Sequence, residues 1–225
     1  MWISKNKEER KDEFIQTALK LFMKKGYEKT SLNDILREMN ITKGSFYHNF
    51  ESKEDLLNGC VDMIAYEFSQ IVSNSADKTE LSAIEMLKKI PEDMSGFRKE
   101  NKWLYEIFEA IETDEKNAFL HGKIIERIIE ISKMYLKKIL NKGNEEGVLS
   151  VADTDMAAEI YISLLILYKQ KVVKTIKNKE IDGLENIKVR LDNLEIMFSK
   201  MISGLLGADN MNLDYLKVMD YGSES

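Results

Sequence analysis

A single proline in 225 residues is the feature that most constrains how this chain folds. That residue is Pro91, and only 11 glycines accompany it. Proline and glycine are the residues that most disfavour helix interiors, and turns and loops are rich in both. Hydrophobic residues make up 44% of the chain, close to the globular average, so the chain is not expected to be disordered. The composition therefore predicts an ordered chain that is almost entirely α-helical.

Apolar residues at helical spacing, with capping signals between them, predict where the helices lie. They predict helices over 8–25, from 31 to about 39, over two turns after Thr42, from 52 to about 74, over 80–90, and at about 94–112, 115–142, 153–177 and 184–206. Pro91 is expected to end the helix over 80–90. The residues beyond 206 leave two alternatives open, a short amphipathic helix and an unstructured end.

Residues 31–50 have the pattern of a helix-turn-helix. Ser31 and Asp34 have capping-box spacing, and Thr42 is the cap of a second, short helix. Asn40 tolerates the left-handed backbone that a tight turn between the two helices requires. Ser52 and Asp55 repeat the capping-box spacing, start a new helix and so limit the second helix to about two turns. The sequence thus predicts an all-α fold of about nine helices, with a three-helix domain at 1–51 and a larger helical domain at 52–225.

The short second helix carries the side chains expected of a nucleic-acid interface. Residues 1–60 hold 11 basic against 10 acidic residues, whereas 61–225 hold the remaining 22 basic and 29 acidic ones, so any polyanion is expected at the first quarter. Phe46 and Phe50, four residues apart, are expected to face inward. The residues expected at DNA are Thr42, Lys43, Gly44, Ser45, Tyr47, His48 and Lys53. Gly44 has no side chain to block close approach. The alternative is a packed helical corner with incidental polar side chains.

The segment "TSLNDILREMNITKGSFYHNFESKEDLL" resembles the N-terminal domain of TetR/AcrR-type transcriptional regulators, and the resemblance extends over about residues 8–60. It implies that Ser31, Thr42, Lys43, Ser45, Tyr47, His48 and Lys53 lie at positions that contact DNA. Asn40 stands where glycine is common, and Phe46 replaces the usual leucine. Asn49 replaces a common histidine, so one phosphate contact is expected to be altered or lost.

The resemblance also implies a homodimer on a palindromic operator of double-stranded DNA, and a small-molecule effector that releases it. Two very apolar helices at 153–177 and 184–206 favour a four-helix interface between two chains, although cover by the rest of the same chain is the alternative. The residues predicted for the interface are Ile160, Leu164, Leu167, Leu184, Ile187, Leu191, Leu194, Phe198, Met201 and Leu205. The last seven follow a heptad spacing.

A hydrophobic effector is expected, because aromatic and methionine residues are frequent in the middle helices. The residues predicted to line its pocket are Met63, Tyr66, Phe97, Trp103, Phe108, Phe119, Met134, Tyr161 and Tyr168. The same residues at the same spacing also fit an ordinary core. A regulator without an effector, controlled by a protein partner, therefore remains the alternative function.

Other functions and locations are disfavoured by what the sequence lacks. It has no glycine-rich phosphate loop, no Cys/His dyad and no ligand set with zinc spacing, so neither an enzyme nor a cofactor is expected. The lone Cys60 excludes an intramolecular disulfide and is expected to be a small buried apolar residue. The longest apolar run, 160–168, has nine residues where a membrane span needs about 20. A soluble, cytoplasmic protein is the expectation.

Overall fold

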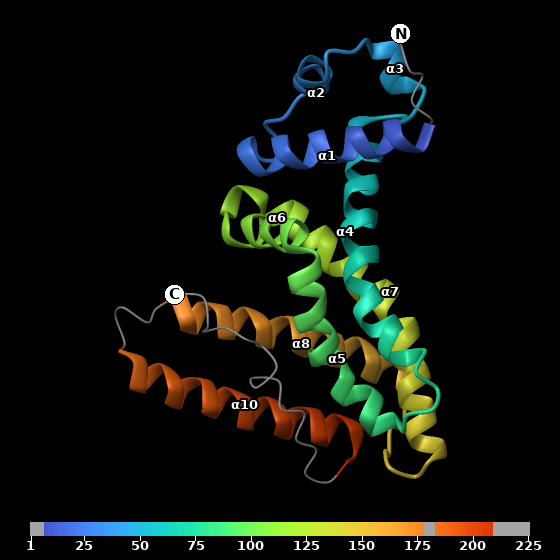
Figure 1. The fold of residues 1–225 in the computed structure, drawn as a ribbon, viewed down its shortest axis with the longest axis vertical. Coiled ribbons are helices and arrows are strands. Elements are labelled where there is room, and N and C mark those ends of the chain that lie inside the picture. The colour runs from blue at the N-terminus through green and yellow to red at the C-terminus, as the bar shows by residue number, and fades with distance from the viewer. Residues whose placement is uncertain (1–6, 178–182, 209–225) are drawn as a thin grey trace. The chain divides into compact units, whose positions relative to one another are not determined.

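A computed structural model describes residues 7–177 and 183–208, and these residues form nine α-helices, one 3-10 helix and no strand (Figure 1). The helices are α1 (Lys7–Lys25), α2 (Leu32–Met39), α3 (Lys43–Tyr47), α4 (Lys53–Ala76), α5 (Ala83–Glu100), α6 (Lys102–Thr113), η1 (Glu115–Asn117), α7 (Ala118–Glu145), α8 (Thr154–Lys177) and α10 (Leu184–Leu206). The predicted all-α class is confirmed. Residues 209–225, where a short helix and an unstructured end were both open, lie outside the described residues.

The prediction that a helix ends at Pro91 is wrong, because α5 runs through this residue to Glu100. Proline has no N–H to donate to the carbonyl four residues earlier, here that of Leu87, so it normally interrupts a helix. In α5 the side chains around the proline are buried: those of Met86, Leu87, Ile90 and Pro91 itself. Burial of this face compensates for the missing hydrogen bond and holds the backbone helical.

The chain forms two compact units. The N-terminal unit holds the described residues up to Glu67 together with Asn101–Ile128, and the C-terminal unit holds Phe68–Glu100 and the described residues from Ile129 onward. Helices α4 and α7 each contribute residues to both units. The helix-turn-helix therefore forms one compact unit with the start of α4, with α6 and with the start of α7. The domain boundary between residues 51 and 52 stays a prediction.

The N-terminal unit is built on the apolar face of α1. Its residues Phe14, Ala18, Leu19 and Phe22 have no exposed surface, and α1 packs against α2 and α6. Cys60 of α4 is also fully buried, and its thiol donates to the carbonyl oxygen of Ile15 at 3.7 Å. The full burial of Cys60 confirms its expected role as a small apolar residue of the core, and the same burial raises the pKa of its thiol.

The C-terminal unit contains one continuous apolar core, to which α4, α5, α7, α8 and α10 all contribute buried residues. Helices α8 and α10 lie side by side within it (Figure 1). The end of α10 is tied to the loop after α7, where the backbone N–H of Ser150 donates to the carbonyl oxygen of Leu206 at 3.0 Å. Throughout the described ranges, 7–177 and 183–208, every helix is too short or too polar to cross a lipid bilayer.

Candidate nucleic-acid interface

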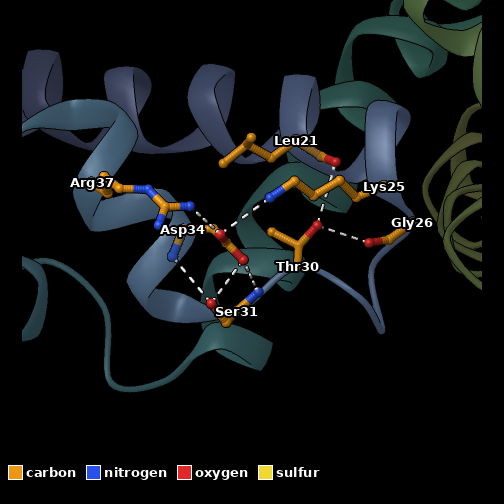
Figure 2. A network of polar contacts seen from close by, with 7 residues as sticks. All are labelled: Leu21, Lys25, Gly26, Thr30, Ser31, Asp34 and Arg37. Atoms are coloured by element: carbon orange, nitrogen blue, oxygen red, sulfur yellow. Dashed lines mark hydrogen bonds and ion pairs between the residues drawn. The ribbon is translucent and has the colours of Figure 1, made fainter.

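The start of α2 is fixed by the predicted capping box (Figure 2). The Ser31 hydroxyl accepts from the backbone N–H of Asp34 at 3.1 Å, and an Asp34 carboxylate oxygen accepts from the backbone N–H of Ser31 at 2.9 Å. The same carboxylate accepts from Lys25 at the end of α1, at 3.1 Å, and from Arg37 at 2.7 Å. The contact with Lys25 attaches α2 to α1, so the box orients the helix as well as capping it.

Thr30 reinforces this junction from inside the fold. Its side chain is fully buried, and its hydroxyl lies 2.8 Å from the carbonyl oxygen of Gly26 and 3.3 Å from that of Leu21 (Figure 2). Leu21 belongs to α1 and Gly26 follows its last residue, so the Thr30 hydroxyl contacts the C-terminal end of this helix. Gly26 has a φ of +82°, a left-handed conformation that glycine readily adopts at the end of a helix.

The turn between α2 and α3 has three residues, and its geometry is the predicted one. Asn40 has φ 52° and ψ 50°, and its backbone N–H points at the carbonyls of Arg37 and Leu36. Thr42 then caps α3, its hydroxyl accepting from the backbone N–H of Ser45 at 3.4 Å. Two helices joined by so short a turn are held at a defined angle, which is what a helix-turn-helix requires.

Helix α3 is anchored by three phenylalanine rings. The ring of Phe14 meets those of Phe46 and Phe50 edge to face, at centroid distances of 5.5 and 5.6 Å. Phe46 and Phe50 are stacked 5.9 Å apart. All three side chains are buried, so both predicted inward-facing residues are confirmed. Five residues are too few for a stable isolated helix, and this aromatic cluster supplies the packing that holds α3.

The remaining surface of α3 is exposed. Tyr47 is 58% exposed although its ring packs edge to face on Phe46 at 5.3 Å, and Lys43, Gly44 and His48 are also exposed. A Cβ atom built on Gly44 would meet only the Thr42 hydroxyl, at 3.8 Å. The ammonium of Lys43, the phenol of Tyr47 and the imidazole of His48 are thus exposed together with the backbone at Gly44, which no side chain covers. Such a surface offers hydrogen-bond donors to phosphates and base edges.

Three other residues predicted at DNA have partners within the chain. Lys53 is half-buried, and its ammonium donates to the carbonyl oxygen of Tyr27 at 2.8 Å. Asn49 donates its side-chain amide to the carbonyl oxygen of Ser45 at 2.8 Å, while its own buried Oδ1 accepts no hydrogen bond. Ser31 is exposed, but its hydroxyl is engaged with Asp34. The contact of Lys53 with Tyr27 was not foreseen, because it joins residues 26 positions apart in the sequence.

The residues predicted for an effector pocket do not share one environment. Phe108, Tyr161 and Tyr168 are buried, and Met63 and Phe97 are partly buried. Four others are about half exposed: Tyr66, Trp103, Phe119 and Met134. Phe119 stacks on Tyr27 at a centroid distance of 5.6 Å. The nine residues are also divided between the two units, since Phe97, Met134, Tyr161 and Tyr168 belong to the C-terminal unit and the rest to the N-terminal one.

The residues predicted for a dimer interface also divide. Ile187 and Phe198 are buried within the chain itself, whereas Ile160, Leu167 and Met201 are 39%, 46% and 45% exposed. Leu164, Leu191, Leu194 and Leu205 are partly buried, and the side chain of Leu184 lies outside the described part. The heptad pattern thus mixes residues that pack on α8 with residues that face outward. Further exposed apolar residues, absent from the prediction, are Met156, Val189, Ile196 and Met197.

Comparison with known proteins finds relatives among bacterial regulators. Residues 14–60 match the family model described as bacterial regulatory proteins, tetR family. The chain is 39% identical over 92 residues to the uncharacterised HTH-type transcriptional regulator YuxN of Bacillus subtilis, a match over 41% of this chain and 28% of YuxN. It is 25% identical over 158 residues to IcaR of Staphylococcus aureus, the biofilm operon icaADBC HTH-type negative transcriptional regulator, over 70% of this chain and 79% of IcaR.

A solved structure shows that the likeness in fold extends over most of the chain. A TetR-family transcriptional regulator from Pectobacterium atrosepticum superposes with a TM-score of 0.55, covering 89% of this chain and 95% of that one. Its sequence identity to this chain is 21%, so this comparison shows similarity of fold alone. The chain spans less than a third of the length of YuxN, and the family model matches residues 14–60, which include the helix-turn-helix.

Proposed function

We propose that the chain, whose residues 14–60 match the tetR family of bacterial regulatory proteins, is a transcriptional regulator that binds operator DNA through α3. The observation that carries the proposal is the exposed face of α3, with Lys43, Tyr47 and His48, held by the buried rings of Phe46 and Phe50. Lys43 would contact a phosphate, and Tyr47 and His48 would reach the groove.

We propose further that the regulator is a repressor and acts as a homodimer on a palindromic operator. IcaR, the relative matched over most of its length, is a negative regulator. A homodimer is supported by the exposed apolar residues of α8, namely Met156, Ile160 and Leu167, which recur at a spacing of four and seven residues on one face of the helix. Two copies of α3 in successive major grooves would lie about 34 Å apart.

A small hydrophobic effector that releases the DNA is part of the same proposal. Its candidate site lies in the C-terminal unit, at the predicted pocket residues that are buried or partly buried there, because half-exposed side chains do not enclose a ligand: Phe97, Tyr161 and Tyr168. An effector that binds the DNA-incompetent state better by about 1.4 kcal/mol lowers operator affinity tenfold.

The alternative, control by a protein partner, is favoured by a different observation. Trp103, Tyr66 and Met134 are 49%, 55% and 55% exposed, and large exposed apolar side chains are typical of protein contacts. Substituting Trp103 with alanine would abolish partner control and leave a small-molecule response intact, which distinguishes the two forms of regulation.

The test is fluorescence anisotropy on the DNA upstream of the protein's own gene, at a series of salt concentrations. Specific binding with a palindromic footprint is the expected result. Lys43→Ala should lower the slope of log K against log salt by about 0.9 per protomer, as expected for one lost phosphate contact. Lys20→Ala is the matched control, because Lys20 is an exposed lysine of α1. Equal salt slopes for both variants and the wild type would refute the proposal that α3 contacts the DNA.

A further inference from the structure

The side chain of Tyr27 connects several elements of the N-terminal unit. Its ring packs edge to face on Phe22 of α1 at a centroid distance of 5.3 Å, and stacks on Phe119 of α7 at 5.6 Å with 27° between the ring planes. The ammonium of Lys53, in the first turn of α4, lies 4.0 Å from the centroid of the same ring. It also donates to the backbone carbonyl oxygen of Tyr27 at 2.8 Å.

The backbone at this point approaches η1 closely. A Cβ built on Gly26 would lie 3.1 Å from the carbonyl oxygen of Lys116, and the φ of +82° independently favours glycine here. The turn that carries Tyr27 is therefore fixed against the segment that leads into α7. On α7, the Lys123 ammonium lies 5.4 Å from the centroid of the Phe119 ring, so that ring also contacts a cation.

The contacts with Tyr27 determine where the charge of Lys53 lies. A lysine side chain loses rotamer entropy when its ammonium is fixed. In this structure Tyr27 already restrains it, and the hydrogen bond to the Tyr27 carbonyl occupies one of the three N–H groups of the ammonium. The others can serve a phosphate with little further entropy loss.

We propose that Phe119 is a positioning residue for DNA binding: by stacking on Tyr27, it holds the Lys53 ammonium in place for a phosphate of the operator backbone. The inference rests on the proposed function and adds a determinant outside the helix-turn-helix, at the start of α7. Removing the ring of Phe119 should loosen the Tyr27 side chain, and with it the Lys53 ammonium above that ring, while leaving α3 untouched. Since an aromatic pair contributes modestly, the expected loss of operator affinity is about two- to tenfold.

The experiment is a double-mutant cycle of operator affinity with Phe119→Leu and Lys53→Met, each measured over a salt series with the full chain. We expect Lys53→Met to lower the salt slope by about 0.9 per protomer. Phe119→Leu should weaken binding in the wild-type background and have no further effect in the Lys53→Met background. Phe119→Tyr keeps a ring and should bind as the wild type does. Phe119 is 51% exposed, so its substitution should leave the fold intact, which far-ultraviolet circular dichroism checks.

Equal losses from Phe119→Leu in both backgrounds would overturn the inference, because Phe119 would then act independently of Lys53. An unchanged salt slope for Lys53→Met, together with a reduced slope for Lys43→Ala, would also overturn it and leave the proposed function standing. Absence of specific DNA binding by the wild type would overturn both this inference and the proposed function.

Discussion

The ring of Phe198 in α10 stacks on the ring of Tyr168 in α8, with centroids 4.4 Å apart and 28° between the ring planes. The Tyr168 hydroxyl in turn donates to the carboxylate of Glu195, one turn before Phe198. Both rings are almost completely buried within one chain. Phe198 therefore belongs to the core of the protomer, although its heptad spacing had placed it at the interface between chains.

Phe198→Ala should destabilise the protomer by about 3–5 kcal/mol, because it removes a buried ring and leaves a cavity beside Tyr168. Urea denaturation followed by circular dichroism measures this loss. Met197→Ala is the matched control, since the neighbouring Met197 is 54% exposed and its loss should change stability little. Similar effects of the two substitutions would show that Phe198 is not a core residue in solution.

Leu167→Glu should convert the proposed homodimer to a monomer without unfolding it. Leu167 is 46% exposed on α8, so a charge there is solvated in the isolated protomer but buried and unpaired in the proposed interface. Light scattering over a micromolar concentration range measures the change. Val148→Glu is the control, at an exposed apolar residue of the loop after α7. A dimer that persists in Leu167→Glu would exclude this face of α8.

Gly44→Ala should fold at least as stably as the wild type and bind the operator at least tenfold more weakly. Alanine is the better helix former by about 1 kcal/mol, and a Cβ here meets nothing closer than 3.8 Å in the protein. A DNA backbone that packs directly on Gly44 would be displaced. Anisotropy and thermal unfolding measure the two effects, with Gly122→Ala of α7 as control, where a Cβ meets nothing within 4 Å. Unchanged affinity would show that DNA does not approach this position.

Asp34→Asn should destabilise the protein at pH 7, and by less at pH 3. Hydrogen bonds from the backbone and hydroxyl of Ser31, and then from Lys25, hold the pKa of the Asp34 carboxyl well below its usual range. A lowered folded-state pKa means that the stabilisation is present above the unfolded pKa, near 3.9, and is lost as pH falls toward the folded value. Urea midpoints of wild type and variant at the two pH values test this. An equal difference in urea midpoint between wild type and variant at both pH values would show that ionisation of Asp34 does not contribute to stability.

Local sequence signals predicted the helix-turn-helix well, because each depends on neighbouring residues. The capping box at Ser31, the left-handed Asn40 and the inward rings of Phe46 and Phe50 are confirmed. A capping contact also forms at Ser52, whose hydroxyl accepts from the N–H of Asp55 at 3.0 Å. The Asp55 carboxylate instead accepts from the N–H of Glu51, one residue earlier than capping-box spacing predicts.

Features that depend on distant residues were not predictable in the same way. α5 continues through Pro91 because its surroundings are buried, and packing partners are not visible in a local pattern. The attachment of Lys53 to Tyr27 joins residues 26 positions apart. The heptad spacing of α10 identified an apolar helix but not its partner, since packing on α8 and packing on a second chain require the same residues.

The placement of the exposed face of α3 and the exposed apolar residues of α8 in different compact units has a genetic consequence. In the proposed homodimer, a chain altered at Tyr47 keeps Leu167 and would still associate with an unaltered chain. In a cell that carries both alleles, such mixed assemblies would occupy the operator poorly, so the Tyr47→Ala allele would be dominant over the wild type. Alleles altered at Leu167 would be recessive, because their products would not enter assemblies with the wild-type protein.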